Sequence, residues 1–172
     1  MIPVLVLACG NPLRGDDGFG RWMAAKIQEQ FSSSQVEVLS SQQFTPEMTE
    51  SISTSDTVIF LDCSATSAPG QISLSPVQAV VKPARLMTHH MSPASLLRMS
   101  QELYGRIPRV AYLITVGGES FKMEEQLSDS IRGAAPAVLA MVEEIVQAAN
   151  GQRWNLPGSE LDLEDIAELA LV

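Results

Sequence analysis

Two kinds of segment alternate along the chain. Almost entirely apolar runs occupy residues 4–9, 57–61 and 110–116, and such runs are typical of strands buried on both faces of a sheet. Between and after these runs, apolar side chains recur at helical spacing, most clearly in residues 18–31 and in the segment after Ser128. This alternation predicts a three-layer α/β fold, in which helices cover both faces of a twisted, mostly parallel sheet.

Turn residues and helix caps place the remaining elements. In chain order we expect a first strand at residues 2–9, a second at residues 36–39, a helix starting at Thr45, an edge strand at residues 71–74, and a helix from Ser92 that stops at Gly105. The strand at residues 57–61 is expected to end at Asp62. Pro136 lies inside the last helical segment, so we expect a kink there or a late helix start.

The length and a late change in composition predict the domain organisation. A chain of 172 residues suits one domain with its own core, and we expect a single α/β domain over residues 1–150. Residues 151–172 begin with a linker that contains Pro157 and then predict a short acidic helix, or an acidic tail, from Ser159. The pattern fits both a docked and a free segment.

The charge balance excludes several partners. The formal net charge is −9, whereas nucleic acids and anionic membrane surfaces require a basic face. No apolar run reaches the length of a membrane span, and the N-terminus lacks the basic region and cleavage site of a signal peptide. We therefore expect a cytoplasmic protein. Its two cysteines, Cys9 and Cys63, form neither a disulfide framework nor a zinc pattern, and buried reduced thiols are expected.

Polar side chains that suit metal chemistry stand at three places. Asp16 and Asp17 follow the first strand, Asp62 ends a buried strand, and the pair His89-His90 precedes a helix cap. In parallel sheets the carboxyl ends of the strands meet at one edge, so two carboxylates and an imidazole can form a divalent-metal site there. Each signal also has a plain structural reading as a turn, an N-cap or an exposed loop.

Four glycines after the first strand suggest a competing function. Gly10, Gly15, Gly18 and Gly20 crowd this segment, as glycines do in dinucleotide-binding loops. The spacing Gly-x-Gly-x-x-Gly is absent, however, and two adjacent carboxylates would repel a pyrophosphate. A Rossmann-like nucleotide-binding protein is therefore the weaker alternative.

Taken together, these motifs resemble the hydrogenase maturation endopeptidases. Residues 6–20 look like the signature of that family, with its Gly-Asn and Asp-Asp/Glu-Gly elements. Residues 60–63 are similar to its second acidic motif, and residues 88–93 resemble its histidine motif. Weaker matches follow at residues 115–119. The resemblance covers about residues 1–149 and implies the α/β fold of these proteases.

The resemblance implies a metal-binding triad of two acids and one histidine. Carried over by motif, the triad falls on Asp17, Asp62 and His89. His90 is the alternative to His89, and it fits the histidine motif only with a gap of one residue. Asp16 is a further catalytic candidate, either as the group that positions the attacking water or as the residue that holds the loop.

The implied activity is one specific peptide-bond cleavage. Members of the family remove the C-terminal extension of a nickel–iron hydrogenase large-subunit precursor after nickel insertion, and nickel in the substrate serves as the recognition signal. The resemblance therefore implies substrate-borne nickel, with other divalent cations able to occupy the site. A monomer is expected, because it suits an enzyme that must embrace a large protein substrate. A nickel-sensing chaperone without hydrolytic activity would use the same three ligands and is the alternative function.

Overall fold

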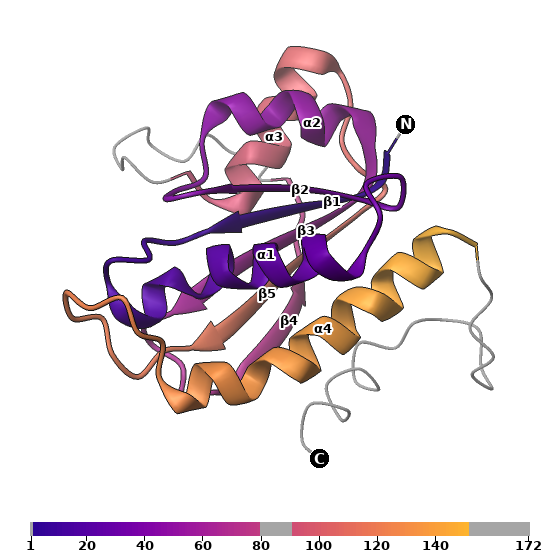
Figure 1. Cartoon of the computed structure of the whole chain (residues 1–172). Helices are drawn as coiled ribbons and strands as arrows, with labels where there is room; N and C mark the ends of the chain where they lie inside the picture. Colours follow the sequence, from indigo (N-terminus) through magenta and orange to yellow (C-terminus); the bar gives the residue numbers. More distant parts are fainter. Residues whose placement is uncertain (1, 80–90, 152–172) are drawn as a thin grey trace.

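The computed structural model describes residues 2–79 and 91–151, which form a sheet between two helical layers (Figure 1). The strands are β1 (Ile2–Cys9), β2 (Val36–Ser41), β3 (Ser55–Ser64), β4 (Ile72–Pro76) and β5 (Val110–Gly117). Their order in the sheet is β2-β1-β3-β5-β4. The pairs that join β2, β1, β3 and β5 are all parallel, and only β4 pairs antiparallel, at one edge. The predicted mostly parallel sheet is thus confirmed.

Helices cover both faces of this sheet, as predicted. They are α1 (Phe19–Gln30), α2 (Thr49–Thr54), α3 (Pro93–Tyr104) and α4 (Asp129–Ala149), with short 3₁₀ turns at Gly15–Gly18 and Pro46–Met48. In Figure 1, α1 and α4 lie on one side of the sheet, and α2 and α3 lie on the other. Each helical layer shields one set of alternating strand side chains from water, which produces two hydrophobic cores.

The central strand β3 shows why these runs are almost entirely apolar. Ile59 and Leu61 belong to the core under α1 and α4, whereas Val58 and Phe60 belong to the core on the opposite face. All four side chains are fully buried. Since both faces of this central parallel strand are covered, its middle positions are all apolar.

Several predicted boundaries and caps are confirmed. The side chain of Ser92 accepts a hydrogen bond from the backbone N–H of Ser95 at the start of α3, and Gly105 ends that helix in the left-handed conformation at φ 67°. The strand predicted at residues 71–74 is the edge strand β4. Within residues 2–79 and 91–151, no helix is long and apolar enough to cross a membrane.

The structure corrects one predicted element end and decides another that was left open. The third strand does not end at Asp62 but continues to Ser64, because β5 extends beyond β1 and pairs with these last residues. Of the kink and the late start expected at Pro136, the late start is excluded, since α4 begins at Asp129 and contains Pro136. Ser128 caps its first turn, and Ile131 is fully buried there, so capping and packing offset the hydrogen bond that the proline removes.

Candidate functional site

Close backbone packing explains the glycines after β1. Gly10 adopts φ +146°, and a Cβ atom there would lie 1.9 Å from the carbonyl oxygen of Asp17. A Cβ atom at Gly20 would lie 2.1 Å from the carbonyl oxygen of Cys9 and 2.9 Å from that of Leu61. The start of α1 therefore rests directly on the carboxyl ends of β1 and β3. This contact accounts for the glycines without a bound phosphate.

Asp16 is fully buried and joins two loops that are distant in sequence. One carboxylate oxygen accepts hydrogen bonds from the backbone N–H groups of Glu119 at 2.7 Å and Ser120 at 3.0 Å. The other accepts the N–H of Ser128 at 2.7 Å. Burial by itself raises the pKa of Asp16, but these donors outweigh it, and the pKa lies below its usual value. Asp16 is thus held charged between the β1–α1 and β5–α4 loops.

The backbone strengthens the same junction. The N–H of Gly15 donates to the carbonyl of Glu124 at 2.6 Å, and the N–H of Asp16 donates to the carbonyl of Ser120 at 2.9 Å. The Asp16 side chain is fully buried and faces backbone amides, since all its hydrogen bonds come from the β5–α4 loop and from the start of α4. Of the two roles expected for Asp16, this geometry favours holding the loop.

Asp17 and Asp62 line one cavity, as expected from the strand ends. Asp17 lies in the 3₁₀ turn before α1 and accepts the N–H of Asn11 at 3.0 Å. Asp62 lies near the carboxyl end of β3 and accepts the N–H of Cys63 at 2.8 Å. This acid cavity measures about 310 Å³ and is also lined by Cys9, Gly10, Asn11, Arg14, Gln42, Gln43, Phe44, Cys63 and Met91.

Asp62 lies in surroundings that disfavour its charged form. The pKa of Asp62 lies above its usual value, mainly because the side chain is buried. Hydrogen bonds from the Cys9 thiol and the Cys63 amide lower this pKa, whereas the neighbouring carboxylate of Asp17 raises it. Two carboxylates that face one cavity repel each other unless a cation lies between them. Carboxylate oxygens of this kind, with space beside them for further ligands, are chemically suited to a divalent cation.

The two thiols beside this cavity differ in exposure. Cys9 is buried, as predicted, and burial together with the nearby Asp62 carboxylate strongly raises its pKa. Cys63 is only half-buried, which corrects the expectation that both thiols are buried. It lies on the part of β3 that extends past the end of β1. Burial and the charges of Asp16, Asp62 and Asp17 raise the pKa of Cys63 to about 12, so both thiols are neutral.

The predicted histidine ligand, His89, and its alternative, His90, lie outside the described residues. The described chain resumes at Met91, and this residue lines the acid cavity. Within residues 2–79 and 91–151, no group of three or more His, Cys, Asp or Glu side chains is arranged to hold a metal ion. Asp17 and Asp62 therefore supply two candidate ligands, and the third stays a prediction.

Other residues of the cavity were missed from the sequence. Gln42, Gln43 and Phe44 follow the carboxyl end of β2, and Arg14 lies in the loop after β1. The rule that found Asp62 would also have found the residues after β2, because β2 is parallel to β1 and ends at the same edge of the sheet. Their uncharged side chains gave no separate chemical signal.

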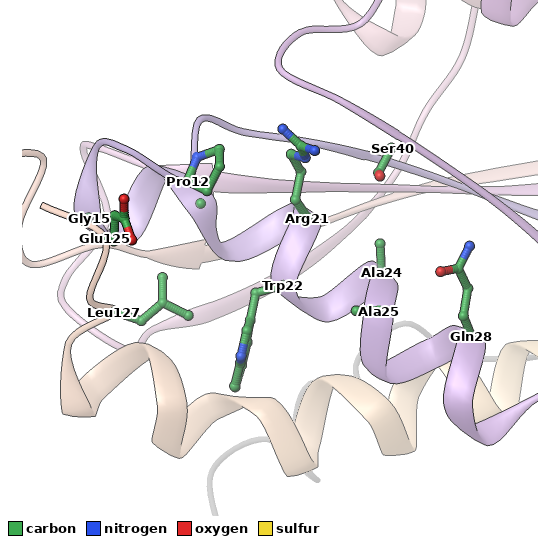
Figure 2. A pocket seen from close by; sticks show the side chains of 11 residues that line it. Pro12, Gly15, Arg21, Trp22, Ala24, Ala25, Gln28, Ser40, Glu125 and Leu127 are labelled. Carbon is green, nitrogen blue, oxygen red and sulfur yellow. The ribbon is translucent and has the colours of Figure 1, made fainter.

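A second cavity, of about 340 Å³, lies along α1 and contains neither Asp17 nor Asp62 (Figure 2). Its lining comes from α1, the loop before α1, the end of β2 and the β5–α4 loop: Pro12, Gly15, Gly18, Arg21, Trp22, Ala24, Ala25, Gln28, Ser40, Glu125 and Leu127. In Figure 2, Arg21 and Gln28 lie on the same side of α1 as Ser40, and Trp22 lies on the opposite side. This arrangement forms a groove rather than a second group of acids.

Solved structures share this fold and define the class of protein. A hydrogenase 2 maturation peptidase from Thaumarchaeota archaeon SCGC_AB-539-E09 is 27% identical, with a TM-score of 0.61 over 82% of this chain and 95% of that one. The hydrogenase maturating endopeptidase HybD from E. coli is 25% identical, with a TM-score of 0.62 over 84% and 93%. The nickel–iron hydrogenase maturation protease HycI from Thermococcus kodakarensis is 22% identical and shows the fold alone, with a TM-score of 0.64 over 84% and 92%.

The sequence comparison identifies the family. The sequence model of the HycI family, described as hydrogenase maturation protease, matches residues 23–147, which is well over half of the chain. The chain belongs to the hydrogenase maturation protease family and is a peptidase of that class. The matched range includes Asp62, whereas Asp16 and Asp17 precede it. No curated protein sequence matches the chain.

Proposed function

We propose that this peptidase removes the C-terminal extension of a nickel–iron hydrogenase large-subunit precursor after nickel insertion, and that nickel in the substrate is the recognition signal. The proposal rests on the cavity at the carboxyl edge of the sheet, which Asp17 and Asp62 line. The chain that forms this cavity belongs to the hydrogenase maturation protease family. The protein acts as a monomer in the cytoplasm, in keeping with its acidic charge and with a substrate that is itself a large protein.

Each acid has a separate task in this proposal. Asp17 and Asp62 bind the nickel that the precursor brings, with His89 as the third protein ligand implied by the family motif. Three protein ligands leave coordination positions for the substrate's own groups, and bound nickel polarises a carbonyl or a water as a Lewis acid. Asp16 keeps the Asp17 loop in place through the β5–α4 loop. An apoprotein without substrate should bind divalent cations only weakly, because two carboxylates alone make an incomplete site.

The test is cleavage of the physiological kind of substrate. The full chain is incubated with a nickel-loaded large subunit that carries its extension, and the product mass is measured. A shortened product is expected with nickel-loaded precursor, and none with nickel-free precursor or with the Asp17→Asn variant. Stable binding of the loaded precursor without any shortened product would instead indicate a nickel-sensing chaperone. Equal cleavage of loaded and nickel-free precursor would contradict nickel as the signal.

A further inference from the structure

The strand β2 forms one edge of the sheet and turns a row of backbone groups away from it. In the part of the chain that the structure describes, β2 pairs only with β1. The carbonyl of Ser41 accepts the N–H of Gly10 and therefore faces β1. Because successive residues of a strand direct their backbone groups to opposite edges, those of Val36, Val38 and Ser40 face outward.

This outward row has few partners. The N–H of Val36 donates to Ser32 in the preceding turn, and the carbonyl of Val38 accepts a long bond of 3.4 Å from the Gln28 side chain. The N–H of Val38 and both backbone groups of Ser40 have no hydrogen-bond partner among residues 2–79 and 91–151. Such groups are a template for a further strand.

Devices that normally protect an edge are missing from β2. Its sequence contains no proline and no lysine, and its one charged residue, Glu37, directs its backbone toward β1 rather than outward. The opposite edge strand, β4, ends in Pro76, which has no N–H to offer. The two edges of the same sheet therefore differ, and the edge beside the acid cavity is the open one.

The groove along α1 lies beside the end of the open edge at Ser40, and the cavity of Asp17 and Asp62 begins where β2 ends. Ser40 lies above α1 between Arg21 and Gln28, and the exposed Ala25 lines the same cavity of about 340 Å³ (Figure 2). Directly after β2, residues 42–44 line the acid cavity instead. Residues of the loop between β1 and α1 line both cavities.

We propose that an extended segment of the precursor, next to the bond that is cut, binds as an added strand along the outer edge of β2. This inference rests on the proposed function and states how the peptide reaches the acids. Backbone hydrogen bonds to Val38 and Ser40 hold the segment in register, and every second side chain lies toward α1 at Arg21 and Ala25. The added strand continues past Ser41, so that the chain enters the cavity of Asp17 and Asp62.

The first test removes one outward N–H group of β2 and keeps the hydrogen bonds between β2 and β1. Ser40→Pro deletes that donor and places a ring on the open edge, whereas Ser40→Ala keeps the donor and loses only the exposed hydroxyl. Processing of the nickel-loaded precursor should show a KM about tenfold higher for Ser40→Pro, with kcat within about twofold. Ser40→Ala should match the unmodified protein in both constants.

A second pair of variants tests the groove through a different element. Ala25→Gln places a longer, uncharged and helix-compatible side chain where the added strand would lie, and Ala25→Ser is its control. Ala25→Gln should raise KM about fivefold, while Ala25→Ser should not, because one occluded contact costs on the order of a single hydrogen bond. Thermal unfolding checks each variant, and the Ala25 pair decides if Ser40→Pro does not fold.

The outcomes separate this inference from the proposed function. If the unmodified chain does not shorten the nickel-loaded precursor, the proposed function itself fails. If the unmodified chain cleaves, but Ser40→Pro and Ala25→Gln have the KM of their controls, cleavage stands and the added strand is overturned. A fall in kcat with unchanged KM in folded variants would also overturn it, because the edge would then act on the acids and not on peptide binding.

Discussion

Asp16 and Asp17 are neighbours in sequence, yet they lie in opposite surroundings. Asp16 is buried at the junction of two loops, where three backbone N–H groups occupy its carboxylate. Asp17 is half-buried, accepts one N–H, from Asn11, and lines the open cavity with Asp62. A carboxylate whose acceptors are already used stabilises the fold, whereas one with free acceptors facing space is available to a ligand.

The largest expected loss of activity comes from substitution of Asp17 or Asp62, the two acids that line the cavity. Asp17→Asn and Asp62→Asn each replace a carboxylate in the cavity by a neutral amide of similar size. Because a substrate-borne cation would lose one charged ligand, processing should fall at least about 10²–10³-fold, the size of loss known for one electrostatic contact in an active site. The measurement is product mass against time with nickel-loaded precursor. Near-normal rates would show that these carboxylates do not take part in the reaction.

A stability measurement then contrasts the two neighbours. Asp16→Asn removes a buried charge that accepts three backbone hydrogen bonds and introduces an amide N–H₂ group facing other donors. The free energy of unfolding should fall by about 2–3 kcal/mol, since bonds to charged groups are the strong ones. Asp17→Asn is the matched control and should change it by less than about 0.5 kcal/mol. Urea unfolding at neutral pH measures both, and equal losses would contradict the contrast.

The stability that Asp16 contributes should also depend on pH. The pKa of Asp16 is lowered in the folded protein, so its contribution to stability is fully present above the unfolded pKa of about 3.9 and is lost as pH falls toward the folded pKa. The stability difference between the unmodified chain and Asp16→Asn should therefore be constant above about pH 5 and shrink below about pH 4. Asp62, whose raised pKa acts in the opposite direction, is present in both proteins and cancels. A difference that grows on acidification would reverse the assignment.

Local sequence signals predicted the framework well, because they report local physics. The apolar run that contains Val58 predicts a strand covered on both faces, and the cap at Ser92 and the stop at Gly105 fix α3. The positions of Asp17 and Asp62 at one edge follow from the parallel order of β1 and β3. In each case the residue and its cause are close together along the chain, or are related by a general rule of the fold.

The parts that the sequence did not predict depend on distant partners. The donors to Asp16 lie more than 100 residues further along the chain, so no local pattern separates this acid from Asp17. The sequence left open whether the last helix starts before Pro136, and burial of Ile131 in the core, which proline rules do not include, favours the early start. The open edge of β2 likewise appears only when the strand order is known.

Asp62 and Cys63 are a second pair of sequence neighbours with different expected roles, and the effect expected on substitution of Cys63 is the smallest. Both line the cavity, but burial and the neighbouring carboxylates raise the pKa of the Cys63 thiol to about 12, so the thiol is neutral at pH 7. A neutral thiol is a weak nucleophile and a poor metal ligand, and Cys63→Ala should leave kcat/KM within about twofold. Cys63→Ser, which keeps a polar group of similar size, is the control. Loss of processing in both variants would give Cys63 a role beside Asp62, whereas loss in Cys63→Ala alone would indicate a gap in the cavity wall.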